Sequence, residues 1–296
     1  MPRGGAVRAG SDGGQFVLLR VSWLNHRRLK SEDLRLSRFR QALLGAQRTR
    51  GYQEPLRAAG LDSPRAIRAV RSIEEGLVRL PSINYEQIRA APEDFRNPDA
   101  PPQQPQRLWC PLGGSALRVA VIGSGFEESE AVRVFSTADP RAIRELDPEL
   151  VAAPVDTLLN WAAERRAVPI AHRGIIAFTS LAVASMPETT REFLWRAFEV
   201  PVFEQWAGAD GSVLAAECEA HEGLHVFDGT AVVEQEAGNR VVVTSLVDRR
   251  HPTLRVTAEF TGRLVTEPCA CGQPGPRLTG VKTTVIERPS GAGVLA

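Results

Sequence analysis

The chain has 296 residues, of which 43% are hydrophobic and 24% are charged, and its formal net charge at pH 7 is +1. This length can bury a sizeable core, and the composition excludes wholesale disorder. The near-zero charge gives no indication of a nucleic-acid partner, and no apolar run reaches the ~20 residues that cross a bilayer. The first residues, MPRGGAVRAGSDGG, contain no apolar signal region, so we expect a cytoplasmic protein. Four cysteines in a chain of this length predict no disulfide scaffold.

Strand and helix patterns alternate over the first part of the chain. We expect residues 1–30 to form a loose tail and Ser31 to cap a helix over residues 32–49. The segment NPDAPPQQPQ at 97–106 is rich in Pro and Gln, which predicts a loop or linker. The alternation predicts an α/β domain with N-terminal helices and a largely parallel sheet over residues 31–212.

The pattern changes at residue 213. Strand-like runs LHVF, TAVVEQ, RVVVTSL, TLRVTAEF and GRLVTE are broken by Gly, Asn and Pro. This predicts a small β-rich subdomain over residues 213–288, followed by a tail at 289–296.

A set of cysteines and histidines in the β-rich segment is the sharpest chemical signal. Cys218, His221 and His225 lie in AECEAHEGLHV, and Cys269 and Cys271 lie in EPCACGQPG. Zinc takes four nitrogen or sulfur ligands in a tetrahedron, usually from two close pairs. The spacing predicts Cys269 with Cys271 as one pair, and Cys218 with a histidine as the other.

The choice of histidine stays open at this point. We place His225 in the site because an apolar strand run would hold its ring firmly, and His221 on the loop is the competing choice. Since Cys-x-Cys is less usual than Cys-x2-Cys, the alternative interpretation is a pair of reduced cysteines in a turn beside surface histidines. Four protein ligands would make the zinc structural rather than catalytic. Cys110 stands apart and is expected to be a small core residue.

Two common catalytic motifs are missing. Gly-Ser-Gly at 123–125 follows a strand pattern but lacks the third glycine of a dinucleotide-binding fingerprint. The serines that we considered, at 180, 185 and 212, lie in no G-x-S-x-G context, which argues against a Ser-His-Asp hydrolase.

Longer stretches of the sequence carry a family resemblance. Three stretches follow the order of three family motifs, which are E-C…G-L-H, then T-S-L…P-x-[IL]-R-Y-R-x-G-D, then C-x-C-G-R. In this chain they read GLHVFDGTAVVEQ, VVVTSLVDRRHPTLRVTAEFTGRL and EPCACGQPGPRLTGV. A fourth stretch, FEQWAGADGSVLAAEC, occupies the place of an aromatic-G-x-T-E motif. This order resembles the phenylacetate-CoA ligase-like branch of the adenylate-forming acyl-activating enzymes over residues 35–285. The resemblance implies the fold of that family's large domain, activation of a carboxylic acid with ATP and Mg²⁺, and acyl transfer to CoA. It also favours the zinc set, which several branches carry.

The candidate nucleotide site departs from the family pattern. Where the family has a Ser/Thr/Gly-rich phosphate loop, this chain has NPDAPPQQPQRLWCPLGGSALR, whose prolines lack N–H donors. By the resemblance, Trp206 takes the place of the ring that stacks on adenine, and Asp210 that of the Mg²⁺-associated glutamate. Glu259 takes that of the ribose-binding aspartate, and Arg255 completes the candidate cofactor-binding set. We also expect the small C-terminal domain, with its catalytic lysine, to be absent.

These observations predict a degenerate relative of phenylacetate-CoA ligase-like enzymes with a structural zinc ion. It would have lost autonomous adenylation, so that binding of ATP or AMP with Mg²⁺ is doubtful, and would bind a small carboxylic acid, an acyl group or a partner protein. The alternative is an unorthodox acid-CoA ligase or acyltransferase whose C-terminal domain comes from another chain. A purely structural protein of a larger assembly is the third possibility, and we expect neither nucleic acid nor membrane as a partner.

Overall fold

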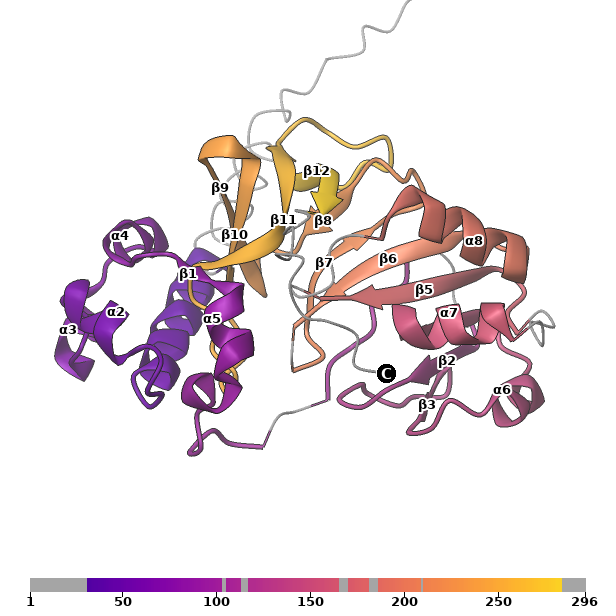
Figure 1. The fold of residues 1–296 in the computed structure, drawn as a ribbon, viewed down its shortest axis with the longest axis horizontal. Coiled ribbons are helices and arrows are strands. Elements are labelled where there is room, and N and C mark those ends of the chain that lie inside the picture. Colours follow the sequence, from indigo (N-terminus) through magenta and orange to yellow (C-terminus); the bar gives the residue numbers. More distant parts are fainter. Residues whose placement is uncertain are drawn as a thin grey trace, which may run out of the picture.

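The computed structural model describes residues 31–102, 105–112, 117–164, 170–180, 186–208 and 210–283. One long mixed sheet runs through the molecule (Figure 1), with its strands in the order β3-β2-β4-β5-β6-β7-β8-β12-β11-β10-β9 and β1 beside β11. The strands are β1 (Ile83–Asn84), β2 (Val119–Ile122), β3 (Val132–Phe135), β4 (Leu150–Pro154), β5 (Gly174–Thr179), β6 (Val202–Ala207), β7 (Val213–Glu217), β8 (Leu224–Val226), β9 (Ala231–Glu236), β10 (Arg240–Ser245), β11 (Val256–Val265) and β12 (Arg277–Thr283).

Helices flank the two halves of this sheet. The helices are residues 31–46, α2 (Gln53–Ala58), α3 (Pro64–Ala69), α4 (Ile73–Arg79), α5 (Tyr85–Ala90), α6 (Pro140–Leu146), α7 (Val155–Ala163) and α8 (Glu188–Phe198), with short 3-10 turns η1 (Pro92–Phe95) and η2 (Ala237–Asn239). In the described part of the chain, no helix is long and apolar enough to span a membrane.

The strands from β3 to β6 form the parallel half of the sheet. Ala120 and Ile122 of β2 point to one face, where they join a core with side chains of α6, α7 and α8. Val119 and Val121 alternate with them and pack on the opposite face. Because both faces of these strands are covered, they read in the sequence as unbroken apolar runs. The expected α/β arrangement with parallel strands is confirmed for this half.

The second half of the sheet is antiparallel and is continuous with the first. β7 pairs antiparallel with β6, so the sheet passes through residue 212 without interruption. The prediction of two runs, TLRVTAEF and GRLVTE, was wrong, because both belong to the single strand β11. Gly262 lies inside this strand, and a Cβ there would come within 2.9 Å of the Leu278 side chain. The register between β11 and β12 changes between Thr261 and Arg263, the two neighbours of this glycine. Gly262 therefore marks a bulge and not the end of a strand.

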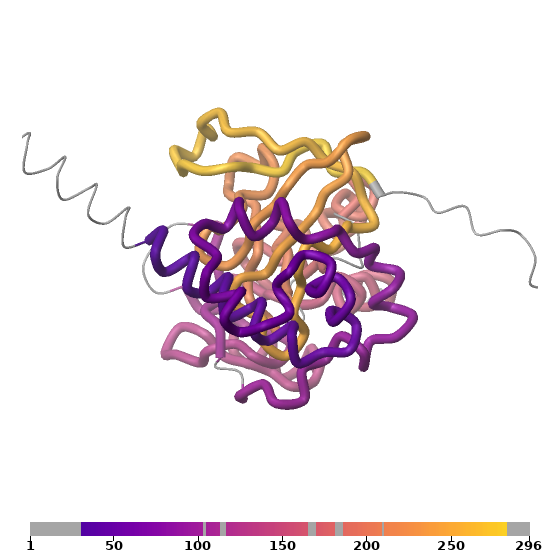
Figure 2. The backbone as a smooth tube through the Cα atoms, turned by 90° about the vertical axis from the view of Figure 1, so that its left-hand side faces the viewer, coloured from indigo at the N-terminus to yellow at the C-terminus, as the bar shows by residue number. Residues whose placement is uncertain are grey.

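The N-terminal helices cover the far end of the antiparallel half (Figures 1 and 2). The first of them, expected over residues 32–49, is helical through residue 46 and ends in a turn. Its residues Phe39 and Leu43 are completely buried, in a core that includes Leu246 and Leu254 next to β10 and β11. The hydroxyl of buried Tyr52 accepts a hydrogen bond of 2.9 Å from the Leu254 N–H, which ties the helices to the sheet.

Gly76 of α4 makes the closest approach in this helical core. A Cβ at Gly76 would lie 2.4 Å from the ring of Phe39, which is fully buried and cannot move aside freely. We expect Gly76→Ala to lower the free energy of unfolding, because overpacking costs ~1–3 kcal/mol, more than the roughly 0.5–1 kcal/mol that alanine gains in a helix. Urea denaturation measures this. Val78→Ala, at a position 85% exposed on the same helix, is the control and should change stability by less than about 0.5 kcal/mol. A Gly76→Ala chain as stable as the wild type would contradict the prediction.

Candidate metal centre

The first half of the cysteine and histidine group lies on the connection between β7 and β8. Cys218 directly follows the last residue of β7, and the chain turns back so that His225 of β8 lies opposite Ala216. Gly223 has a φ of +109°, and a Cβ there would lie 2.5 Å from the Leu278 carbonyl oxygen of β12. A residue with a side chain would therefore push β12 away from this turn.

The second half lies on the loop between β11 and β12. Cys269 opens a tight turn in which the Gly272 N–H donates to its carbonyl oxygen over 2.9 Å. β12 then pairs antiparallel with β8, with Arg277 opposite His225. This pairing folds the loop over β8 and brings Cys269 and Cys271 to the first pair.

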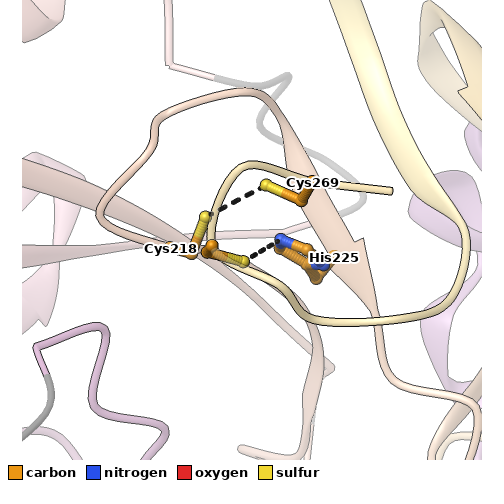
Figure 3. A group of neighbouring side chains, drawn as sticks. Cys218, His225 and Cys269 are labelled. Carbon is orange, nitrogen blue, oxygen red and sulfur yellow. Dashed lines mark hydrogen bonds between the residues drawn. The ribbon is translucent and has the colours of Figure 1, made fainter. Parts of the chain in front are cut away.

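The four predicted zinc ligands meet in one group (Figure 3). The ligand atoms of Cys218, His225, Cys269 and Cys271 all lie within 4.8 Å of one another. The Sγ atoms of Cys218 and Cys269 are 3.6 Å apart, and Cys271 Sγ is 3.5 Å from His225 Nε2. A tetrahedral zinc ion with bonds of ~2.3 Å to sulfur and ~2.0 Å to nitrogen requires spacings of about 3.5–3.8 Å. The group can therefore hold a metal ion such as zinc.

The sulfur atoms of Cys218 and Cys271 lie in different electrostatic environments. Burial raises the pKa of Cys218 to about 12, with the neighbouring thiols acting in the same direction. Burial acts in the same sense on Cys271, but the Gln273 N–H, the other thiols and Arg277 hold its pKa below the ordinary value. Backbone N–H groups two residues further on, at Ala220 and Gln273, donate to Cys218 and Cys271. Such donors stabilise thiolates, the form that binds metal.

A buried arginine that the sequence interpretation missed braces both loops. Arg277 is 6% exposed and donates to the Glu222 carbonyl oxygen at 2.9 Å and to its carboxylate at 3.0 Å. Its other nitrogen donates to the Glu267 carbonyl oxygen at 3.2 Å, and Glu222 also accepts from the Ala270 N–H at 3.2 Å. Arg277 and Glu222 thus connect the two ligand loops without touching the metal position. No spacing rule could identify this pair, because 55 residues separate them.

The two candidate histidines are placed differently. His225 is buried among the cysteines, and its Nδ1 atom has no hydrogen-bond partner. The His221 ring instead stacks on Phe203 at 4.8 Å between centroids, and its Nδ1 is 3.6 Å from a carboxylate oxygen of Glu217. His221 therefore braces β7 and β6 and lies outside the metal group. Cys110 also lies outside it, half-buried, and its Sγ donates to the Leu112 carbonyl oxygen at 3.3 Å.

Two of the nucleotide-site candidates are buried in the chain's own contacts. Trp206 is 1% exposed, and its ring meets Phe260 at 5.2 Å in an edge-on arrangement. Stacking on an adenine would require this ring to leave the core. Asp210 is buried and accepts hydrogen bonds from the backbone N–H of Ser212, at 2.9 Å, and from its hydroxyl. Ala209 of the WAGAD stretch and Gly113, Gly114 and Ser115 of the segment in the place of the phosphate loop lie outside the described residues.

The other two candidates form ion pairs within the chain. Arg255 is held between Glu234 and Glu236, each at 3.0 Å. Glu259 pairs with Arg89 of α5 at 3.1 Å. The charges expected to bind nucleotide are thus neutralised by the chain itself.

Asp248, a second buried acid, was also missed by the sequence interpretation. Its Oδ1 accepts from the N–H groups of Arg250 and His251 at 3.0 and 2.8 Å, whereas its Oδ2 is buried without a hydrogen-bond partner. Burial, together with the charge of Asp210, raises the pKa of this carboxyl to about 7. The two acids come from the β6–β7 and β10–β11 connections, which the sequence pattern alone could not bring together.

Comparisons with known proteins identify the fold. No protein-family model and no curated protein matches the sequence. An open conformation of 2-hydroxyisobutyryl-CoA ligase in complex with 2-HIB-AMP and CoA matches with a TM-score of 0.58 and 14% identity, over 86% of this chain and 70% of that chain. The same ligase in the thioesterification state gives a TM-score of 0.58 with 14% identity over 86% and 69%. Its postadenylation state gives 0.57 with 15% identity over 86% and 68%.

At this identity the similarity establishes the fold alone. The chain shares the mixed α/β fold of 2-hydroxyisobutyryl-CoA ligase. The phenylacetate-CoA ligase-like branch and the zinc subdomain stay predictions.

The metal group predicts a defined zinc content. We expect chain purified in reducing buffer to carry about one zinc ion, because four donors close one coordination sphere. Cys269→Ser should release the metal and lower the melting temperature, since metal binding is coupled to folding. Elemental analysis and thermal unfolding measure both effects. Cys110→Ser is the matched control and should retain the metal, and a wild-type chain without zinc would refute the assignment.

The raised pKa of Asp248 predicts a pH dependence of stability. Its value moves from 3.8 to about 7 in the folded chain, so this carboxyl stabilises the fold below pH 3.8 and loses that contribution as the pH rises through about 7. Asp248→Asn should therefore gain stability relative to the wild type as the pH rises from 3.8 to about 7, by at most ~1.4 kcal/mol per pH unit, and the difference should level off above that range. Chemical denaturation at several pH values tests this, with the exposed Asp62→Asn as control. A difference between Asp248→Asn and the wild type that does not vary with pH would disprove the prediction.

Proposed function

We propose that this chain is a zinc-stabilised binding protein, a degenerate relative of phenylacetate-CoA ligase-like enzymes that works in the cytoplasm. It binds a small carboxylic acid or acyl group and does not adenylate it autonomously. One observation carries the proposal, namely that the four side chains at the nucleotide-site positions are all engaged by the chain's own groups.

The ion pairs supply the first part of the support. Adenylation requires donors and a metal ion that stabilise charge on the phosphates as it develops. Arg255 has its guanidinium between two carboxylates and also donates to the Leu80 carbonyl oxygen. It has little capacity left for a ribose or a phosphate. Glu259 would have to give up Arg89 before its carboxylate could accept from ribose hydroxyls.

The buried groups supply the second part. Exposing the Trp206 ring to adenine would remove one of the largest fully buried side chains from the core. Losing such a ring from a core costs ~3–5 kcal/mol when it is truncated, which gives the scale of the penalty. Asp210 holds the turn after β6 by accepting from Ser212, and this carboxylate would have to abandon that turn to coordinate Mg²⁺.

The proposal of an acyl ligand is based on the fold. The 2-hydroxyisobutyryl-CoA ligase of the same fold holds 2-HIB-AMP and CoA. A chain that keeps the scaffold and loses the nucleotide contacts would retain the part of such a site that recognises the acid. The cysteine and histidine group fits a reducing compartment, where thiols stay available for metal.

Pyrophosphate exchange tests the proposal. We expect ATP–pyrophosphate exchange at background level with a panel of carboxylic acids, including 2-hydroxyisobutyrate and phenylacetate, and expect at least one acid to raise the melting temperature. Active 2-hydroxyisobutyryl-CoA ligase serves as the positive control. Exchange above background that disappears in Asp210→Ala would overturn the proposal in favour of an unorthodox acid-CoA ligase. A melting temperature unchanged by every acid would instead reject the ligand.

A further inference from the structure

A large cavity lies away from the metal group and the nucleotide-site candidates. Its volume is about 1100 Å³, and its walls come from the first helix, residues 101–102 and 105–109 of the Pro-rich segment, the β8–β9 turn and the β10–β11 connection. None of the four metal-group residues and none of Trp206, Asp210, Arg255 and Glu259 lines it.

Arginines dominate the charge of this cavity. Arg38, Arg249 and Arg250 line it, and within the described residues none of the three forms an ion pair with a carboxylate. Arg38 donates to the Gly229 carbonyl oxygen, and Arg249 donates to the Gln41 side-chain oxygen. Both partners are neutral, so neither guanidinium loses its charge.

Arg250 is the least engaged of the three. Its backbone N–H donates to Asp248, but its half-buried guanidinium makes no hydrogen bond to any described residue. The charge of Arg250 acts to lower the pKa of Asp248. The carboxylate of Asp248 nevertheless accepts its hydrogen bonds from backbone N–H groups, and Asp248 does not line the cavity.

The acids of the cavity do not balance the arginines. Glu127 pairs with Arg107 at 3.0 Å, and both are largely exposed. Asp228 is exposed and has no ion-pair partner among the described residues. Three guanidiniums thus face one free carboxylate. A dianionic group would balance this charge, and arginine forks match phosphate oxygens with paired hydrogen bonds.

Another part of the cavity lining is apolar and aromatic. The rings of Trp109 and Phe227 lie 4.9 Å apart with an angle of 56° between their planes. Pro101, Pro102 and Leu108 extend this surface. Aromatic and apolar walls with few convergent polar groups are typical of small-molecule sites, and this wall suits a flat apolar body next to the charged group.

We propose that this cavity binds a phosphate monoester with an apolar, preferably aromatic, body. The phosphoryl group lies against Arg38, Arg249 and Arg250, and the body packs on Trp109 and Phe227. The site does not depend on the zinc group or on the proposed loss of adenylation.

Calorimetric titration of the full chain, without ATP or Mg²⁺, tests the site. Phenyl phosphate should bind saturably with a Kd below roughly 1 mM. Inorganic phosphate, which lacks the ring, and benzoate, which lacks the second charge, should each bind at least tenfold more weakly. Trp109→Leu should reduce the preference for phenyl phosphate over inorganic phosphate.

Variants assign the binding to the arginines. Arg250→Gln and Arg249→Gln should each weaken phenyl phosphate binding at least tenfold while circular dichroism and the melting temperature show a folded chain. Arg196→Gln, at an exposed position paired with Glu192 on α8, should bind as the wild type does. The proposal is overturned if phenyl phosphate gives no saturable binding, if benzoate displaces phenyl phosphate with equal affinity, or if both folded arginine variants keep full affinity. These results leave the pyrophosphate-exchange test of the proposed function unaffected.

Discussion

The pairing of β8 with β12 is the interaction on which the arrangement of the whole sheet depends. Every strand from β3 to β8 lies on one side of this seam, and β12 to β9 lie on the other. The seam itself has two register pairs, Arg277 with His225 and Leu278 with Leu224. Backbone hydrogen bonds over so short a ladder contribute little, because each adds only ~0.5–1.5 kcal/mol net. The two sides of the seam also share an apolar core, in which the ring of Trp206 on β6 meets that of Phe260 on β11.

The cysteine and histidine group lies at this seam. Cys218 and His225 lie on the side of the seam that runs from β3 to β8, and Cys269 and Cys271 lie on the loop that leads into β12 on the other side. A metal ion bound by all four would cross-link the halves where the sheet is narrowest. Arg277 adds a buried ionic connection between the same two loops. A structural role for the metal therefore rests on two arguments. Four protein ligands would close its coordination sphere, and the group lies where the ion would join the two sides of the sheet.

The sequence predicted local features and failed where distant segments meet. The alternation of strand and helix patterns predicted a largely parallel sheet over residues 31–212, and spacing selected the three cysteines. The choice of His225 over His221 depends on the β7–β8 register, which places the His225 ring and not the His221 ring beside Cys271. The resemblance gave Trp206 the place of the ring that stacks on adenine, but in the fold this ring is buried against Phe260 on β11.

Two groups of arginines differ in this chain, those that form ion pairs with its own carboxylates and those that line a cavity without such a partner among the described residues. Burying or confining a cation is costly unless an anion accompanies it. Arg255 and Arg277 meet carboxylates of their own chain, and their charges hold strands and loops in place. Arg38 and Arg250 meet none in the described residues, although both line a cavity. A fold under pressure for stability alone would gain by neutralising or exposing such charges. Their position in the same cavity as Trp109 and Phe227 is the arrangement that the proposed phosphate monoester would complete, because its charge would balance guanidiniums that no described carboxylate pairs.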